Sequence, residues 1–196
     1  MRYCITDERL ARIRQVLARR QKGLTLVIDN VHDPHNVSAI LRSCDAFGVP
    51  SVHLYYTTSA FPVLGQKSSA SARKWVMRTR HSDAASMYRG LKEQSFQVLA
   101  TGFSERAKPL TDWDLSAPTA VILGNEHHGA SPELAQVADG EIYIPMMGMV
   151  QSLNVSVAAA IILYEAWRQR WAKGMYDKAS LSPEELALLE KDWVSR

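Results

Sequence analysis

One segment of the chain carries residues that could hold an anion at the start of a helix. Residues 36–48 form an amphipathic pattern that begins at Asn36, shortly after Pro34. We expect Asn36 to cap this helix. We also expect Arg42 to lean back over Ser38, because long helical side chains point toward the helix N-terminus. A guanidinium and free backbone N–H groups in one place suit a phosphate of RNA. A surface helix with one solvated arginine explains the same residues equally well.

A second candidate is a loop bounded by two glycines. An apolar run, residues 121–123, leads to Gly124, and Gly129 closes the loop. Loops at the carboxyl ends of strands carry the functional residues of open α/β sheets. Glu126 in this loop could accept hydrogen bonds from bases or order its neighbours, or it could be solvated. The glycine spacing is that of a phosphate-binding P-loop, but Ala130 replaces the lysine of that motif, so nucleotide hydrolysis is not expected.

A third candidate begins at Ile144, where an apolar strand runs into a loop of Pro, Gly and Met. Ser152 and Asn154 then open a helix that is crowded with alanines. Small side chains on that helix would allow another segment to approach closely. A plain helix cap and a core helix account for these residue types as well as a binding site does.

Other chemistries lack residues that they need. No G-x-G-x-x-G follows the first apolar run, so the usual dinucleotide fingerprint is absent. Two histidine pairs, His32 with His35 and His127 with His128, have no further ligands at the spacing of a metal site, and no metal is expected. Ser152 is not in a G-x-S-x-G turn, so acyl transfer is not expected either.

Length and composition indicate a globular chain with one core. The chain has 196 residues, of which 46% are hydrophobic and 8% aromatic, and this fits one domain with short extensions. The longest apolar stretch, residues 155–164, is too short to cross a bilayer, so no membrane association is expected. No secretory signal is visible, and two cysteines make no disulfide framework. We therefore expect a cytoplasmic protein.

The net charge is only +3, but the basic residues are clustered. Residues 1–22 are strongly basic, and residues 67–80 contain basic residues with no acid. Clustering of this kind suits a polyphosphate surface, although a solvated helix face would have the same composition. The residues that we expect to contact RNA are Arg9, Arg12, Arg19, Arg20, Arg73 and Lys74.

The elements that position these residues alternate between strand and helix, which predicts an α/β fold with a mostly parallel sheet. Thr6 is expected to cap a first helix, and Ser182 a last one. The stretch 57–72, rich in small residues, is expected to be a mobile surface loop. The expected strands are 24–28, 51–55, 96–100, 120–123 and 141–144, and the expected helices are 6–21, 36–47, 83–94, 131–138 and 153–172.

The three candidate segments, in this order, resemble the three sequence motifs of the SpoU branch of the SPOUT methyltransferases. The likeness covers nearly the whole chain and is weakest in residues 55–72 and after residue 176. It is most specific in residues 148–157, which read GMVQSLNVSV. Residues 18–21, 33–36 and 74–76 extend it.

The resemblance implies a SPOUT-type α/β domain over residues 23–174, with a mostly parallel sheet flanked by helices and a deep C-terminal trefoil knot. Residues 1–22 would form a basic N-terminal helical extension, and residues 175–196 a C-terminal one. It also implies a homodimer that packs through the helices near the knot, with each active site built from both chains.

The resemblance further implies 2′-O-methylation of a ribose in tRNA with S-adenosyl-L-methionine as methyl donor, and guanosine 18 of the D-loop is the expected target. The alternatives are ribosomal RNA, a tRNA wobble nucleotide, or an RNA-binding protein without catalysis. Relatives that act on ribosomal RNA commonly carry a separate N-terminal RNA-binding domain, which this sequence lacks. The basic extensions also favour tRNA.

The family's functional residues carry over by position. The resemblance implies that the cofactor is held by Thr101, Gly124, Asn125, Ile144, Met149 and Leu153. The implied catalytic residues are Arg42, Asn36, Glu126, Ser152 and Asn154. An arginine keeps its proton at ordinary pH, so we expect Arg42 to act as an electrostatic clamp rather than as a base, with Asn36 orienting it. His127 and His128 depart from the Lys or Gly common in the family.

Overall fold

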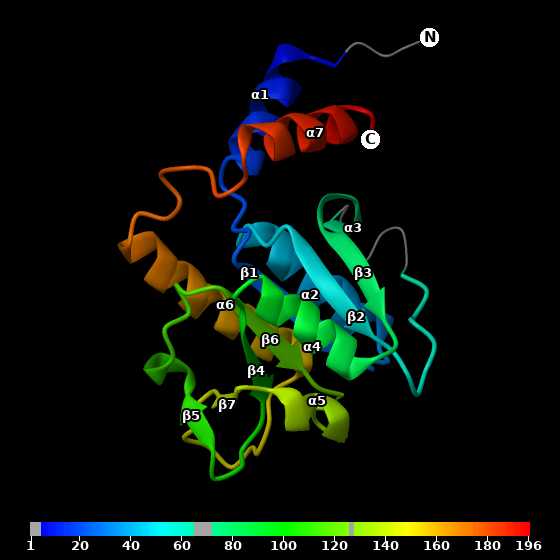
Figure 1. Ribbon diagram of the computed structural model, residues 1–196, viewed down its shortest axis with the longest axis vertical. Coiled ribbons are helices and arrows are strands. Elements are labelled where there is room, and N and C mark those ends of the chain that lie inside the picture. Colours follow the sequence, from blue (N-terminus) through cyan, green and yellow to red (C-terminus); the bar gives the residue numbers. More distant parts are fainter. Residues whose placement is uncertain (1–4, 65–71, 126–127) are drawn as a thin grey trace.

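A computed structural model describes residues 5–64, 72–125 and 128–196. These residues form a seven-stranded sheet in the order β3-β2-β1-β6-β4-β7-β5, in which every neighbouring pair is parallel (Figure 1). The predicted α/β class with a mostly parallel sheet is therefore confirmed. The strands are β1 (Leu24–Asp29), β2 (Ser51–Tyr55), β3 (Met77–His81), β4 (Gln97–Thr101), β5 (Ala107–Pro109), β6 (Thr119–Leu123) and β7 (Gly140–Tyr143).

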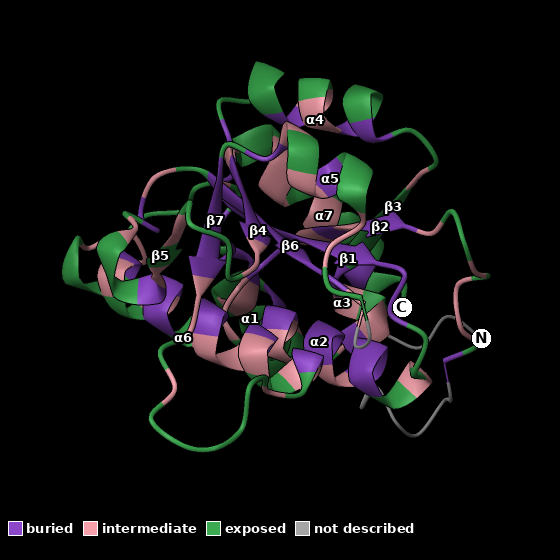
Figure 2. Ribbon diagram, turned by 90° about the horizontal axis from the view of Figure 1, so that it is seen from below, coloured by how far each residue is buried: buried purple, intermediate pink, exposed green. Residues whose placement is uncertain are grey.

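Helices cover both faces of this sheet. Figure 2 shows α2 and α6 on one face and α4 and α5 on the other. No helix in the described ranges is both long and apolar enough to span a bilayer. The helices are α1 (Asp7–Leu17), α2 (Pro34–Ala46), α3 (Ala72–Trp75), α4 (Ala84–Glu93), α5 (Pro132–Val137), α6 (Val155–Ala172) and α7 (Pro183–Val194), and a 3-10 turn, η1, spans Leu110–Asp112.

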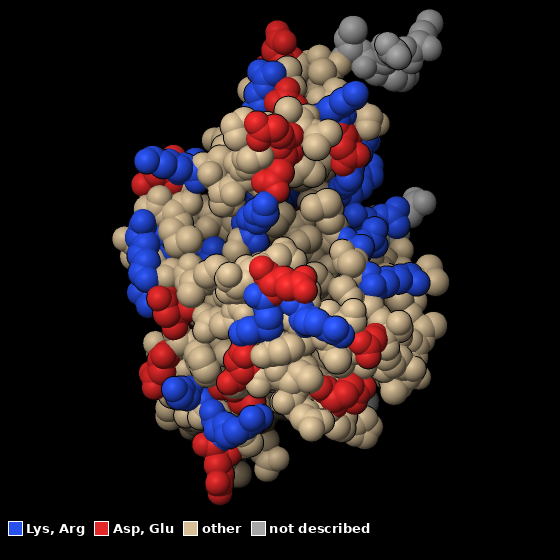
Figure 3. Space-filling model, in the orientation of Figure 1, with Lys and Arg blue, Asp and Glu red and all other residues tan. Residues whose placement is uncertain are grey.

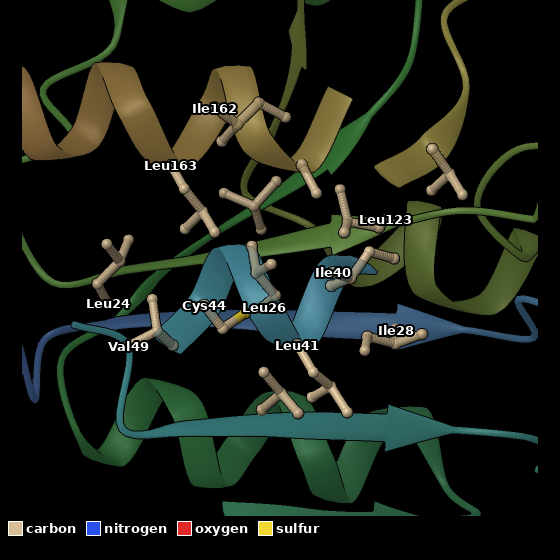
Figure 4. Packing of buried hydrophobic residues seen from close by; sticks show 14 of the residues in the cluster. Leu24, Leu26, Ile28, Ile40, Leu41, Cys44, Val49, Leu123, Ile162 and Leu163 are labelled. Carbon is tan, nitrogen blue, oxygen red and sulfur yellow. The ribbon is translucent and has the colours of Figure 1, made fainter. Parts of the chain in front are cut away.

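The central strands are apolar on both faces because both faces are covered. Every residue of β1 and of β6 is buried, as expected for parallel strands between two helical layers. On one side, Ile40 and Leu41 of α2 and Leu163 of α6 pack with Leu26 of β1 (Figure 4). This packing fixes the start of α6 beside α2, which matters for the site below.

The start of α2 differs from the prediction. The N-cap is Asp33, whose side chain accepts a hydrogen bond from the His35 backbone N–H at 2.8 Å, and Pro34 occupies the first helical turn. Asn36 is therefore not the cap but a helical residue, and it is 8% exposed. Proline favours the first helical position because its fixed φ suits the helix and its missing N–H is not needed there.

Two strands, β3 and β5, were not predicted from the sequence. The side chains of β3 lack an apolar alternation, since four of its five residues are exposed and Arg78 and Arg80 stand among them. This composition is common on the edge strand of a sheet, where charge discourages pairing with another chain. β5 has only three residues and ends in Pro109. Part of the expected 57–72 loop, residues 65–71, lies outside the described residues.

The two ends of the chain pack together at one end of the molecule (Figure 1). Ile13 and Leu17 of α1 form a small core with Trp193 of α7. Thr6 caps α1, and Ser182 begins α7 with a full capping box, as predicted. The helices α1 and α7 are therefore in contact with each other.

A pair of histidines joins β2 to β3. Nδ1 of His53 and Nε2 of His81 are 2.8 Å apart, so one ring donates a hydrogen bond to the other and the two rings cannot both carry a positive charge in this geometry. Burial, reinforced by His81, lowers the pKa of His53 to about 4, and burial lowers the pKa of His81 as well.

This pair predicts a loss of stability in mild acid. The unfolded chain binds a proton at His53 near its ordinary pKa of 6.5, whereas the folded chain does so only near pH 4. The contribution is complete above about pH 6.5 and is lost as the pH falls toward 4, by roughly 1–3 kcal/mol. Urea unfolding at pH 7 and pH 5 measures it. A His53→Gln variant should lose less stability across this interval than the native protein, whereas exposed His32→Gln should not differ from it. Equal losses in all three proteins would refute the assignment.

Candidate active site

A cavity of about 420 Å³ opens at the carboxyl ends of β4, β6 and β7. Its walls come from the ends of these strands, from the segment that joins β7 to α6, and from the first turns of α6. Apolar side chains dominate the lining, among them Leu123, Ile142 and Ile162. A cavity of this size with mostly apolar walls is typical of a small-molecule site, for which about 300–1,000 Å³ is usual.

The loop after β6 forms one wall and depends on Gly124. A Cβ at this position would lie 2.0 Å from the carbonyl carbon of Gly129. Asn125 and Gly129 also exchange two backbone hydrogen bonds, of 2.8 and 2.9 Å, across the loop. Gly129 has a φ of +71°, which favours glycine. The two glycines therefore close the loop tightly at the mouth of the cavity.

Thr101, at the end of β4, ties this wall to the sheet. Its hydroxyl donates to the Ile122 carbonyl oxygen at 3.0 Å and accepts from the Gly124 N–H at 3.4 Å. Three predicted cofactor residues, Thr101, Gly124 and Asn125, line the cavity here. Ile144 and Leu153 also line the cavity.

The start of α6 brings two predicted catalytic residues to the cavity. Ser152 and Asn154 both line it. Asn154 is the N-cap of α6, since its Oδ1 accepts from the Ser156 backbone N–H at 2.8 Å. Its Nδ2 donates to Oδ1 of Asn36 on α2 at 3.0 Å. The packing of α2 on α6 thus joins Asn36 to Asn154, and Ser152 lines the same cavity as Asn154.

Arg42 stands apart from this group. It lies on α2, is exposed and does not line the cavity. It makes no hydrogen bond or ion pair with the described residues, so Asn36 does not orient it as we expected. An exposed, unpaired guanidinium is available for a phosphate or for another protein chain.

Met149 also departs from the prediction. It is 99% exposed and lies outside the cavity that the other five predicted cofactor residues share. Glu126 and His127 lie outside the described residues. The sequence reasoning did not identify Phe103, Tyr143 or Met146 in the lining. Phe103 could have been predicted to line the cavity, because it lies only two residues after Thr101 in the sequence.

A buried polar pair behind the cavity was also missed. Asp29 is fully buried at the end of β1 and accepts from the Ser131 backbone N–H at 2.6 Å. Burial raises the pKa of Asp29, while hydrogen bonds from Ser131 and Asn30 oppose this effect. Asn30 has a φ of 47°, and its carbonyl oxygen accepts from Nδ2 of Asn125 at 2.7 Å. These contacts hold the loop after β6 against β1.

The basic residues expected to contact RNA are not all on the surface. Arg9, Arg12, Arg19 and Lys74 are exposed, and Arg73 is half-buried. Arg20 is only 1% exposed: it bonds to the Val49 carbonyl oxygen and its guanidinium lies 5.1 Å from the centre of the Trp193 ring. The prediction that Arg20 contacts RNA is therefore wrong, because the helix ends at Leu17 and the chain then turns inward.

A glycine-bounded loop and an asparagine-capped helix enclose one cavity at the carboxyl edge of a parallel sheet, in a chain with clustered basic residues. The sequence model of the SpoU rRNA Methylase family matches residues 23–164, and the chain belongs to this family of RNA methylases.

Particular relatives are similar over almost the whole chain. The tRNA (guanosine(18)-2′-O)-methyltransferase of Thermus thermophilus is 48% identical over 97% of this chain and 98% of its own length. The A. aeolicus TrmH/SpoU tRNA modifying enzyme is 42% identical in sequence. Its crystal structure matches this one with a TM-score of 0.90, and the match covers 96% of each chain. The SpoU methyltransferase AviRb from Streptomyces viridochromogenes, in complex with AdoMet, is 26% identical with a TM-score of 0.67, covering 79% of this chain and 59% of its own.

Proposed function

We propose that this chain transfers a methyl group from S-adenosyl-L-methionine to the 2′-oxygen of a ribose in tRNA, at guanosine 18 of the D-loop. The observation that carries the proposal is the cavity that gathers five predicted cofactor residues together with Ser152 and Asn154. The similarity to a tRNA (guanosine(18)-2′-O)-methyltransferase over nearly both full lengths supports the choice of tRNA and of this nucleotide.

The residues of the cavity fit the methyl donor. Its apolar walls, with Leu153 and Ile144, suit the adenine ring, and backbone groups beside Gly124 can read the ring's polar edge. The absence of a side chain at Gly124 lets the backbone of Gly129 and Ala130 lie directly against it. When bound, the donor supplies a sulfonium-activated methyl group. Alignment of the ribose and stabilisation of a developing alkoxide are then left to the protein.

The chain's own residues supply both. Arg42 holds a substrate phosphate and stabilises negative charge on the attacking oxygen, and the proton leaves to phosphate or water. Asn154 positions the substrate, and its hydrogen bond to Asn36 fixes the orientation of its amide. Ser152 stands at the same mouth. Glu126 follows Gly124 by two positions in the sequence, and we propose a role for it in ordering RNA contacts.

We propose that the enzyme is a homodimer and that each active site is built from two chains. An exposed apolar surface supports this: Val157, Tyr164 and Trp171 of α6 are 46%, 53% and 56% exposed. The rings of Tyr164, Trp167 and Trp171 follow one another at 5.4 and 5.7 Å. A contiguous apolar surface of this kind marks an interaction site. Arg42 then acts at the cavity of the partner.

A charged residue on this surface is expected to dissociate the dimer. Tyr164→Glu buries a carboxylate in the interface and should raise the dimer dissociation constant by about 30-fold or more, as a loss of about 2 kcal/mol implies. Sedimentation velocity measures the change. The matched control is Leu188→Glu on α7, 70% exposed in the native chain, which should leave the dimer intact. A monomeric native protein would contradict the proposal.

Exposed arginines of the N-terminal segment are proposed to hold the tRNA backbone. Replacing Arg9, Arg12 and Arg19 together by glutamine should lower the salt slope of tRNA binding by about 0.7–0.9 for each phosphate that the variant no longer neutralises. Binding of S-adenosyl-L-methionine should not change. Substituting residues is the sharper test, because deleting the segment would remove Ile13 and Leu17 from a core. The control is Arg89→Gln on α4; a triple variant with the native slope would refute the proposal.

The remaining features follow from family membership. We propose that residues 23–174 form the SPOUT domain, that residues 1–22 and 175–196 are extensions, and that the C-terminal part is threaded into a trefoil knot. With tRNA as substrate, we place the enzyme in the cytoplasm.

The proposal is tested by incubating the protein with labelled S-adenosyl-L-methionine and bulk tRNA, or ribosomal RNA, and mapping the methyl group. We expect label on the 2′-oxygen of guanosine 18. Label on ribosomal RNA or on a wobble nucleotide would support the same chemistry on another substrate. RNA binding without transfer would make the chain a binding protein.

A further inference from the structure

A second cavity lies at the carboxyl ends of β2 and β3, at the same edge of the sheet as the first. Its volume is about 240 Å³, and Tyr56, Ser59, Phe61, Arg80 and His81 contribute to its lining. This is below the roughly 300–1,000 Å³ of sites for drug-sized ligands, so it suits a single ring system rather than a whole cofactor. The mechanism proposed above makes no use of it.

The cavity offers flat surfaces to a planar ligand. The rings of Tyr56 and Phe61 meet edge to face, with centres 5.2 Å apart. The guanidinium carbon of Arg80 lies 5.4 Å from the centre of the Phe61 ring. Aromatic rings and guanidinium planes are the surfaces on which proteins stack unpaired RNA bases. Phe61 is half-buried and Arg80 is exposed, so both remain accessible.

The cavity also contains a buried polar group with free hydrogen-bonding capacity. The Ser59 hydroxyl oxygen is buried and makes no hydrogen bond with the described part of the chain. Buried polar atoms are nearly always partnered, so a hydroxyl of this kind in a cavity wall is suited to bind a polar ligand. The edge of a nucleobase carries both donors and acceptors, and could satisfy Ser59.

Positive charge gathers near Arg80, on one side of the cavity. Burial lowers the pKa of Arg78, and so do the neighbouring charges of Arg73, Arg80 and Arg196, so these guanidinium groups lie near one another. Figure 3 shows Lys and Arg atoms gathered over the region of α3 and β3. Like charges repel, and a phosphate chain beside the cavity would relieve that repulsion.

Hydrogen bonds connect this cavity to the first one. The backbone N–H groups of Thr57 and Thr58 donate to Oδ1 of Asn30 at 3.1 and 3.2 Å. The Asn30 carbonyl oxygen accepts from Asn125, which lines the first cavity. The loop that carries Ser59 and Phe61 is thus held in a fixed relation to the donor site.

We propose that the second cavity is a subsite for one unstacked base of the RNA substrate, distinct from the nucleotide whose ribose is methylated. The inference rests on the proposed function and deepens it, because the subsite would select RNA in which that base is free to leave its stack.

The direct test is cross-linking with the native protein. tRNA carrying 4-thiouridine at one position at a time is irradiated on the protein, and the cross-linked peptide is identified. We expect at least one position outside the target nucleotide to cross-link within residues 54–61. Cross-links to other parts of the chain, with none here from any position, would overturn the proposal. The experiment reads binding without turnover, so it decides the subsite even if methyl transfer fails.

Substitutions give a second test. Phe61→Leu should raise the KM for tRNA about tenfold because the stacking surface is removed, while kcat and the Kd for S-adenosyl-L-methionine stay close to native. Phe61→Trp keeps a stacking surface and should restore the KM. Arg80→Gln should raise it more than the matched Arg89→Gln on α4. Suppose that the native protein methylates tRNA and that the Phe61→Leu variant has the native KM for tRNA. The proposed subsite is then refuted, and the proposed function stands.

Discussion

Replacing Arg42 by alanine is expected to lower kcat/KM for tRNA methylation by about 100- to 1,000-fold, the usual cost of removing one group that stabilises developing charge. Arg42 does not line the donor cavity, so the Kd for S-adenosyl-L-methionine should stay at its native value. Arg42→Lys keeps the positive charge but lacks the planar guanidinium. Its kcat/KM should therefore lie between those of the native protein and of Arg42→Ala. Single-turnover methyl transfer and calorimetric binding of the donor measure the two effects separately.

The control for this prediction is Arg89→Ala, which removes an exposed arginine from the opposite face of the sheet. Near-normal turnover of Arg42→Ala would remove Arg42 from the mechanism, whether it acts as a clamp or as a base.

A Cβ at position 124 is expected to weaken donor binding. The added atom would lie 2.0 Å from the Gly129 carbonyl carbon and 2.1 Å from the Ala130 nitrogen, both backbone atoms that cannot turn away. Overpacking of this kind costs about 1–3 kcal/mol or more, so Gly124→Ala should weaken donor binding by at least about tenfold. Equilibrium dialysis with labelled donor measures it.

The matched control is Gly90→Ala on α4, where an added Cβ meets no atom within 4 Å. This variant should bind the donor as the native protein does. If Gly124→Ala also bound normally, the loop after β6 would not form the wall of the donor site.

The two variants together test whether active sites are shared between chains. Mixed dimers of Arg42→Ala and Gly124→Ala chains contain one intact cavity and one Arg42 on the other chain. If Arg42 acts across the interface, mixing should restore up to about half of the activity of one native site. If it acts within its own chain, no activity should return.

The sequence predicted the parts of this site that depend on local pattern. Apolar runs between helical patterns predicted the parallel sheet and a functional loop at Gly124, whereas Thr101 came only from the family resemblance. Residue types that cap helices predicted that Ser152 and Asn154 open α6, and Asn154 is its N-cap. These features are visible locally because backbone geometry limits the residue types that can occupy them.

Features that depend on distant partners were not predictable in this way. Arg20 is buried because residues far along the chain, including Trp193, surround it, and helical periodicity alone placed it on the surface. The hydrogen bond from Asn154 to Asn36 joins residues 118 positions apart. By contrast, the preference of proline for the first helical turn could have identified Asp33 as the cap of α2, so that error was avoidable.

The buried polar pair at the end of β1 was also not predictable from local sequence. Asp29 and Asn30 end an apolar strand, and nothing in their spacing indicates that they hold two loops at once. The charged strand β3 was missed because its sequence lacks the apolar alternation from which strands are read.

The central claim is that a methyl donor bound in the first cavity faces a ribose held by Arg42 and Asn154. The most direct measurement is a crystal structure of the assembled protein with S-adenosyl-L-methionine and a tRNA fragment. We predict that the donor lies between Gly124 and Leu153, with its methyl group directed to a mouth formed by Asn154 and by Arg42 of the partner chain. A donor bound elsewhere, or an Arg42 remote from the methyl group in both chains, would contradict the account.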